Sequence, residues 1–160
     1  MANSVKPIPE GYHTLTPHLV CRNADRAIEF YKQAFGAQEY LRMPGSAGKI
    51  THAELKIGDS MVFLCDELGE AGSASPEASG SRAISLHLYV EDVDSTFNRA
   101  IGAGARVEMA VADMFWGDRY GKLTDPFGHQ WSIGTHKEDV APEELARRAQ
   151  AYFAKAAGQG

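Results

Sequence analysis

Residues 15–36 read LTPHLVCRNADRAIEFYKQAFG, and this stretch decides the fold. Apolar side chains alternate with others along its first seven residues, which is typical of a half-buried strand. From Asn23 to Phe35 the apolar positions recur every three or four residues, which is the period of an amphipathic helix. Asn23 suits the N-cap and Gly36 suits the stop, so the stretch predicts a strand followed by a capped helix.

Three more strands complete this first unit, and a second unit repeats its order. In the first unit we expect strands at 38–43, 50–57 and 60–65, with Gly58-Asp59 as a two-residue hairpin turn. In the second unit we expect a strand at 84–90, a helix capped by Asp92, and strands at 105–110, 119–124 and 130–135, with Asp125-Pro126-Phe127-Gly128 as a turn.

The two units can be superposed with a nearly constant offset. His18 and Asp25 lie 69 residues before His87 and Asp94, and Gly58 lies 70 residues before Gly128. An offset that holds through strand, helix and hairpin indicates an internal duplication. We therefore predict an α+β fold of two tandem βαβββ modules.

The whole chain is expected to form one domain. Its parts would be module 1 at about 12–66, a linker at 67–82, module 2 at about 83–136 and a C-terminal helix at 142–157. The linker is rich in Gly, Ser, Ala and Glu, which is typical of a mobile connection. The C-terminal helix carries an apolar stripe that needs a partner surface, made of Leu145, Ala149, Tyr152 and Phe153.

Composition excludes several classes of function. The net charge is -5 and no cluster of Lys and Arg is present, so a nucleic-acid partner is not expected. No apolar run approaches the roughly 20 residues of a membrane span, and residues 1–11 lack the apolar core of a signal peptide. We expect a cytoplasmic protein with two buried free thiols, Cys21 and Cys65.

Several motifs resemble the vicinal oxygen chelate superfamily, which includes glyoxalases, bleomycin resistance proteins and extradiol dioxygenases. They are ADRAIEFY at 24–31, FGA at 35–37, VEDVD at 90–94 and DPFGH at 125–129. The last one, with FWGDRYG at 115–121, resembles the branch named after a phosphonate-operon protein. The resemblance implies that the sheets form one open cup with helices outside, and that the protein is a homodimer.

Alternation along the strands predicts which side chains face the cup. On the first strand Leu15, Leu19 and Cys21 would pack under the helices, and Thr16, His18 and Val20 would face inward. In the second unit the inward residues would be Ser85, His87 and Tyr89. The row toward the helices would contain Ile84, Leu86, Leu88, Val90, Trp131 and Ile133.

The resemblance also implies where a metal would bind. The family's ligand positions fall on Thr16, Val62, Ser85 and Ser132, and a valine with three neutral hydroxyls does not hold a transition metal. No cofactor is therefore expected. The alternative is a displaced site of His18, His87 and Glu54, near His52, that would bind zinc, iron, nickel or manganese.

The aromatic stretch at 115–120 has two interpretations. Trp116 stacks on a flat ligand and Arg119 pairs with an anion, or Trp116 and Phe115 cover a sheet edge or a dimer contact. In the second case Arg119 forms an ion pair with Asp118 or Asp125. His129 is expected to be exposed in its turn.

Two functions remain open. The first is a protein that binds a small organic molecule, aromatic or anionic, in the cup without a metal. Its ligand-binding residues would be His18, His87, Tyr89, Trp116, Arg119, Thr16 and Ser85. The second is a metal-dependent lyase, isomerase or dioxygenase that uses the displaced site. The sequence contains no nucleophile motif, and we assign no catalytic residue.

Overall fold

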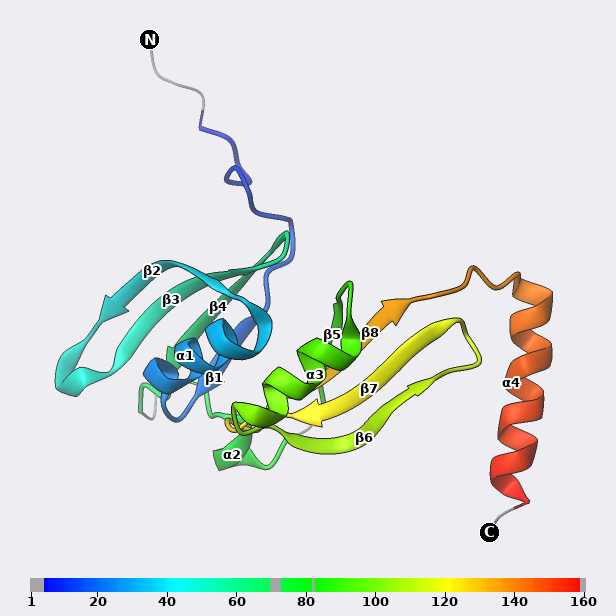
Figure 1. The fold of residues 1–160 in the computed structure, drawn as a ribbon. Helices are drawn as coiled ribbons and strands as arrows, with labels where there is room; N and C mark the ends of the chain where they lie inside the picture. Colours follow the sequence, from blue (N-terminus) through cyan, green and yellow to red (C-terminus); the bar gives the residue numbers. More distant parts are fainter. Residues whose placement is uncertain (1–4, 70–72, 82, 159–160) are drawn as a thin grey trace.

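Two four-stranded sheets, each with one long helix, make up the body of the protein (Figure 1). The computed structural model describes residues 5–69, 73–81 and 83–158. In the first half of the chain the elements are β1 (His18–Cys21), α1 (Ala24–Phe35), β2 (Gln38–Pro44), the 3-10 turn η1 (Ser46–Gly48), β3 (Ile50–Ile57) and β4 (Ser60–Asp66). After them come α2 (Pro76–Ser79), β5 (Ser85–Tyr89), α3 (Val93–Gly102), β6 (Arg106–Asp113), β7 (Asp118–Thr124), β8 (Gln130–His136) and α4 (Pro142–Ala157).

The predicted duplication is confirmed by the strand order. The first sheet runs β1-β4-β3-β2 and the second β5-β8-β7-β6, each with one parallel pair at the start of its order and antiparallel pairs after it. His18 pairs with Phe63, and His87 pairs with Ser132, so both members of the second pair lie 69 residues after those of the first. Within the described residues, no strand of one sheet is hydrogen-bonded to a strand of the other.

The α1 helix forms where its sequence predicts. The Asn23 side chain accepts from the backbone N–H of Arg26, and Gly36 takes the left-handed conformation (φ 66°) that ends the helix. The buried face of α1 includes Ile28 and Tyr31, both fully covered. Covering a side chain such as Ile28 stabilises the fold by about 1.5–3 kcal/mol.

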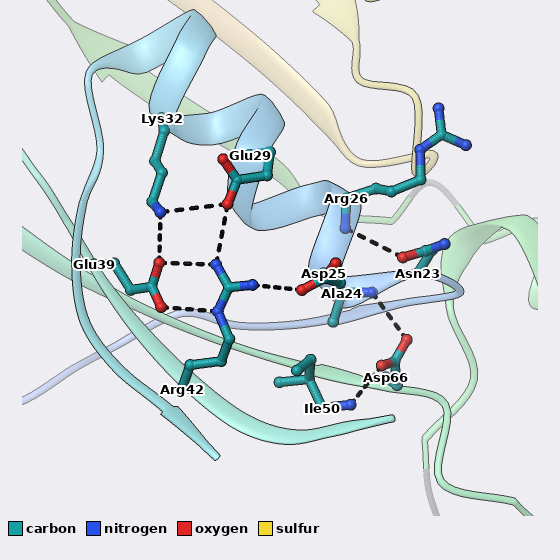
Figure 2. Close-up of polar contacts among 10 residues, drawn as sticks. All are labelled: Asn23, Ala24, Asp25, Arg26, Glu29, Lys32, Glu39, Arg42, Ile50 and Asp66. Atoms are coloured by element: carbon teal, nitrogen blue, oxygen red, sulfur yellow. Dashed lines mark hydrogen bonds and ion pairs between the residues drawn. The ribbon is translucent and has the colours of Figure 1, made fainter. Parts of the chain in front are cut away.

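An ion-pair network on the outer surface ties β2 to α1 (Figure 2). The Arg42 guanidinium contacts Asp25, Glu29 and Glu39, and Lys32 contacts Glu39 at 2.5 Å. These groups are partly exposed, so each pair contributes at most about 1 kcal/mol. The network fixes the position of β2 and does not form a site.

The two modules pack together through their helices and the turn at 125–129. The helices α1 and α3 lie side by side (Figure 1). The hydroxyl of Tyr31 donates to Asp125 Oδ2 at 2.5 Å, and the indole N–H of Trp131 donates to the same oxygen at 3.0 Å. Phe127 packs its ring against Phe30 and Tyr31. The turn motif therefore joins the modules as well as reversing the chain.

The prediction that His129 is exposed is wrong. Its Nε2 donates to the carbonyl oxygen of Val20 at 2.9 Å, across the module boundary. Among the strands that the structure describes, none pairs with the outer edge of β1, so this carbonyl is free to accept. A turn pattern contains no information about what lies opposite the turn, and this contact could not be read from it.

Two apolar residues expected under the helices are exposed instead. Leu15 is 85% exposed and Ile84 is 78% exposed, because β1 begins at His18 and β5 at Ser85. The alternation itself is correct beyond those points: Leu19, Trp131 and Ile133 are buried in the core. The same core encloses Cys21, and burial raises the pKa of its thiol, as expected for an inert cysteine.

The connection between the modules contains a short capped helix rather than an unstructured linker. Ser75 is buried, and its hydroxyl accepts from the N–H of Ala78 at the start of α2. Residues 70–72 and 82 of the predicted linker lie outside the described residues.

The C-terminal helix α4 has the predicted bounds but buries none of its residues. It stands apart from both sheets (Figure 1). Its attachments include the Arg148–Glu138 ion pair and ring contacts of Phe115 with Tyr152 and Phe153, with centroids 5.0 and 6.0 Å apart. Within the described residues, no helix is long and apolar enough to cross a membrane.

Candidate functional site

Each sheet has one face under the helices and one face that no helix of the described residues covers. We call the second the open face. Alternation along the strands places His18 and Phe63 on the open face of the first sheet and His87, Tyr120 and Ser132 on that of the second. The predicted inward orientation of His18 and His87 agrees with this arrangement.

The first open face carries a polar group centred on Glu54. Its carboxylate accepts from the Tyr12 hydroxyl and contacts His52 Nε2 at 3.1 Å. The Tyr12 hydrogen bond, more than the His52 one, lowers the pKa of Glu54. His18 lies beside His52, with ring centroids 5.9 Å apart, and burial followed by the His52 charge lowers the pKa of His18.

The second open face is lined by aromatic rings. His87 Nδ1 lies 2.7 Å from Ser132 Oγ, and the imidazole meets Tyr89 edge to face at 4.4 Å and stacks on Tyr120 at 5.8 Å. Trp116 continues the row, with its ring 5.0 Å from Tyr120. Burial lowers the pKa of His87, so this imidazole is neutral near pH 7. A neutral ring among aromatic rings is suited to contact with another flat ring.

A buried carboxylate, Asp118, holds this row from one end. It is 4% exposed and accepts from the Tyr89 hydroxyl at 2.9 Å, the Trp116 indole N–H at 3.1 Å and His136 Nδ1 at 2.8 Å. Burial raises the pKa of Asp118, but the hydrogen bonds from His136, Tyr89 and Trp116 outweigh burial and lower it overall. The carboxylate therefore stays ionised under its three donors.

Arg119 takes part in an ion pair, as one of its two interpretations predicted, although with other partners. Its guanidinium contacts Asp94 at 2.6 Å and Asp113 at 3.2 Å. These contacts raise the pKa of Arg119, first of all through the hydrogen bond with Asp94. The cation is occupied there, rather than free to meet a ligand anion on the open face.

The predicted ligand-binding residues do not all gather in one cavity. Thr16, His87 and Tyr89 line a cavity of about 540 Å³ between residues 13–17, the β3–β4 hairpin and β5. His18 lines a smaller cavity of about 230 Å³ that also has Leu86 and His129 of the second module in its lining. Three of the seven predicted residues therefore share the larger of these two cavities.

The family's metal positions do not fit a metal in this chain. Val62 is a correction, because it packs in the hydrophobic core under the helices and Phe63 takes the open-face position that corresponds to Ser132. The β3–β4 turn is shorter than the turn at 125–129, so aligning Gly58 with Gly128 misplaces the following strand by one residue. Phe63 has no atom that can bind a metal, and the Ser132 hydroxyl is hydrogen-bonded to His87. These positions therefore offer no set of metal ligands.

The alternative set of His18, His87 and Glu54 is not assembled within one chain. His18 and Glu54 belong to the first sheet and His87 to the second. Among the residues that the structure describes, no group of three or more His, Cys, Asp or Glu side chains is arranged to hold a metal ion.

One residue that the sequence reasoning missed is Lys122. It is exposed and pairs across the sheet with Ser132, which places it on the second open face two residues beyond Tyr120. Among the described residues no ion pair involves its ammonium group. Alternation counted from Tyr120 along β7 was the signal that would have found it.

The chain is similar to proteins of one family in sequence and in structure. A model of the Glyoxalase/Bleomycin resistance protein/Dioxygenase superfamily matches residues 12–133. The uncharacterized protein Mb0911c of Mycobacterium bovis is 43% identical over 148 residues, which cover 91% of this chain and 93% of that protein.

Two solved structures show the same arrangement. TioX from Micromonospora sp. ML1 superposes with a TM-score of 0.63 and 30% identity, over 78% of this chain and 98% of TioX. A PhnB protein from Bacillus cereus has a TM-score of 0.61 and 18% identity, over 77% of this chain and 99% of that chain. At 18% identity the likeness supports the fold alone.

Proposed function

Because the chain belongs to the Glyoxalase/Bleomycin resistance protein/Dioxygenase superfamily, we propose that it binds a small organic molecule in its open cup without the family's metal. The observation that carries this proposal is the row of rings on the second open face, from Tyr89 through His87 and Tyr120 to Trp116. A flat aromatic molecule gains both burial and ring-to-ring contact on such a row.

Charge selects among aromatic ligands. Lys122 lies on this face as a cation, while Arg106 on the same face is paired with Glu108, and Arg119 is paired with Asp94 and Asp113. His87 is neutral and Asp118 is saturated by its donors. A partly anionic aromatic compound therefore complements the face, with its anion at Lys122 and its ring toward Trp116.

The enzymatic alternative has less support. Belonging to this superfamily does not decide whether the chain binds or catalyses, because the superfamily contains both kinds of protein. The residues of each site determine the function. The family's metal positions here hold no donor set, and the displaced His18, His87 and Glu54 are divided between the sheets. We therefore propose binding as the function.

The test uses bicyclic aromatic carboxylates and their neutral amides, screened by thermal shift and then by calorimetry. We expect carboxylates to bind, Trp116→Ala and His87→Ala each to weaken binding by about tenfold, and Lys122→Ala to remove the preference for the acid over the amide. Lys49→Ala, an exposed lysine of the first module, is the matched control and should change nothing.

His18→Ala separates the two faces. If the ligand lies on the second open face, this variant keeps full affinity, and an equal loss in His18→Ala and His87→Ala would place the ligand against both sheets. The proposal would be contradicted if no compound bound. It would also be contradicted if Trp116→Ala and Lys122→Ala left the affinity unchanged.

A further inference from the structure

The buried carboxylate of Asp118 connects the ring row to the segment that leads to α4. On one side Asp118 Oδ2 accepts from Tyr89 and Trp116. On the other side Oδ1 accepts from His136 Nδ1, and the second ring nitrogen, Nε2, lies 2.8 Å from Asp139 Oδ1. Both partners of the imidazole are carboxylate oxygens, which only accept. His136 satisfies both at once only as the imidazolium, which has two N–H donors.

The turn that carries Trp116 is also packed tightly against the segment that follows His136. The carbonyl oxygen of Gly117 accepts from the backbone N–H groups of Lys137 and Glu138 at 2.9 and 3.0 Å. Gly117 has φ 100°, and a Cβ there would lie 2.2 Å from the backbone carbonyl oxygen of Glu138. Because the two segments touch without spare room, a shift in one displaces the other.

We propose that Asp118 is a positioning residue that holds Tyr89 and Trp116 in place for the ligand, and that His136 is a proton-operated latch on this hold. The ligand part of this inference rests on the proposed function, and the latch itself does not. With His136 protonated, one imidazolium bridges Asp118 and Asp139 and fixes both segments. With His136 neutral, one of the two hydrogen bonds is lost and the Trp116 turn is released.

The direction of the pH effect follows from the surroundings of His136. Asp139 first, and then Asp118, raise the pKa of His136 above the ordinary 6.5. A raised pKa means that the bridge is complete below the ordinary value and is lost as pH rises through the folded value. The charged groups Glu91, Asp92, Arg99 and Lys137 and the Tyr89 hydroxyl line the same groove as His136.

The latch is tested without a ligand, by ¹⁹F NMR of protein labelled with 5-fluorotryptophan. The chain has two tryptophans, and Trp116→Phe assigns their signals. We expect the Trp116 signal to move in a one-proton transition with a midpoint above 6.5. Trp131, which donates to Asp125 at the module junction, is the internal control and should stay fixed through that transition.

Three variants identify the titrating group. His136→Asn should abolish the transition, and Asp139→Asn should move its midpoint down toward 6.5, because it removes the first cause of the raised pKa. Glu138→Gln is the matched control: Glu138 lies on the same segment but pairs with Arg148, so the midpoint should hold. The latch would be overturned if the Trp116 signal did not change with pH. It would also be overturned if the transition were still present in His136→Asn.

The ligand part is tested by measuring the affinity for the best bicyclic carboxylate at about pH 6 and about pH 9. We expect weaker binding at the higher pH in the parent protein and no such difference in His136→Asn. Asp118→Asn should weaken binding at both values, because it changes the acceptor of Tyr89 and Trp116. If that buried substitution prevents folding, Tyr89→Phe, which removes one of the Asp118 donors, takes its place with the same expected result. A Trp116 transition with no binding by any compound would contradict the proposed function alone. The positioning role of Asp118 would be overturned if a compound bound tightly and its affinity changed neither with pH nor in Tyr89→Phe.

Discussion

At the scale of single residues, the buried contact between Tyr31 and Asp125 is one of the polar links between the modules. Tyr31 is fully buried, and its hydroxyl donates to a carboxylate that is 3% exposed. Burial first, and the Asp125 charge next, raise the pKa of Tyr31 well above its ordinary value, so the hydroxyl stays protonated and remains a donor.

Tyr31→Phe removes this donor without changing the ring. Asp125 keeps the Trp131 N–H and the backbone N–H groups of Phe127 and His129, so the loss is partial. We expect the free energy of unfolding to fall by about 1–3 kcal/mol in urea denaturation. Tyr40→Phe, at a tyrosine that is 59% exposed, is the control and should leave stability unchanged. Equal stability of both variants would mean that the hydrogen bond contributes nothing to folding.

The side on which a side chain lies could be predicted from the sequence wherever the strand register was secure. Alternation placed His87 and Trp131 on opposite faces of the second sheet correctly. The ligand position that the resemblance implied was wrong by one residue at Val62, because the two hairpin turns differ in length. The three donors on Asp118 come from β5, from the turn between β6 and β7, and from β8, and no local pattern predicts that they converge.

At the scale of elements, the packing of α3 on the second sheet depends on a glycine in β7. A Cβ at Gly121 would lie 2.9 Å from Phe97 Cε2, 3.0 Å from Val111 and 3.2 Å from the Met109 carbonyl oxygen. Phe97 is buried, so its ring has little room to move. The strand therefore accepts no larger residue at this position.

Gly121→Ala is expected to destabilise the protein by about 1–3 kcal/mol through overpacking. Gly102→Ala is the matched control, since nothing lies within 4 Å of its Cβ position at the end of α3. That substitution should be neutral or stabilising by up to about 1 kcal/mol, because alanine is the better helix former. Thermal unfolding of both variants makes the comparison, and a neutral Gly121→Ala would show that α3 can move away from the sheet.

The three longer helices, α1, α3 and α4, were the elements best predicted from the sequence, because their ends are marked locally, whereas the short α2 was missed. The Asn23 cap and the Gly36 stop determine α1, and Pro142 marks the start of α4. The starts of β1 and β5 were placed too early, because an apolar residue beside a strand continues the alternation whether or not it pairs. Exposed Leu15 and Ile84 are such residues.

At the scale of the whole molecule, a metal site would require that ligands from different parts of the protein come together. The displaced ligands are divided between the sheets of one chain, and the family's own positions hold no donor set. We expect zinc, nickel, iron(II) and manganese each to change the melting temperature by less than about one degree, since an ion that does not bind the native state does not stabilise it. A shift of several degrees that is lost in Glu54→Gln would mean that His18, His87 and Glu54 meet between two copies.

The second prediction at this scale is the homodimer. The α4 helix buries no residue, yet Tyr152 is 45% exposed and Phe153 is 62% exposed. A helix of this length is only marginally stable alone in water, so its apolar side needs a cover. We expect light scattering after size exclusion to give twice the chain mass, and a symmetric contact would present the same patch twice.

Two substitutions on α4 decide whether this helix takes part in that contact. Phe153→Glu places two charges in a symmetric apolar contact, and we expect it to shift the protein toward the monomer at micromolar concentration. Ala154→Glu adds the same charge about 100° further around the helix, on its exposed polar side, and should leave the mass unchanged. If both variants remain dimers, the contact lies elsewhere, and the open faces of the sheets become the surfaces to substitute. If the parent protein is a monomer, Phe153 is free in solution, and the ring row of a single chain forms the whole binding face.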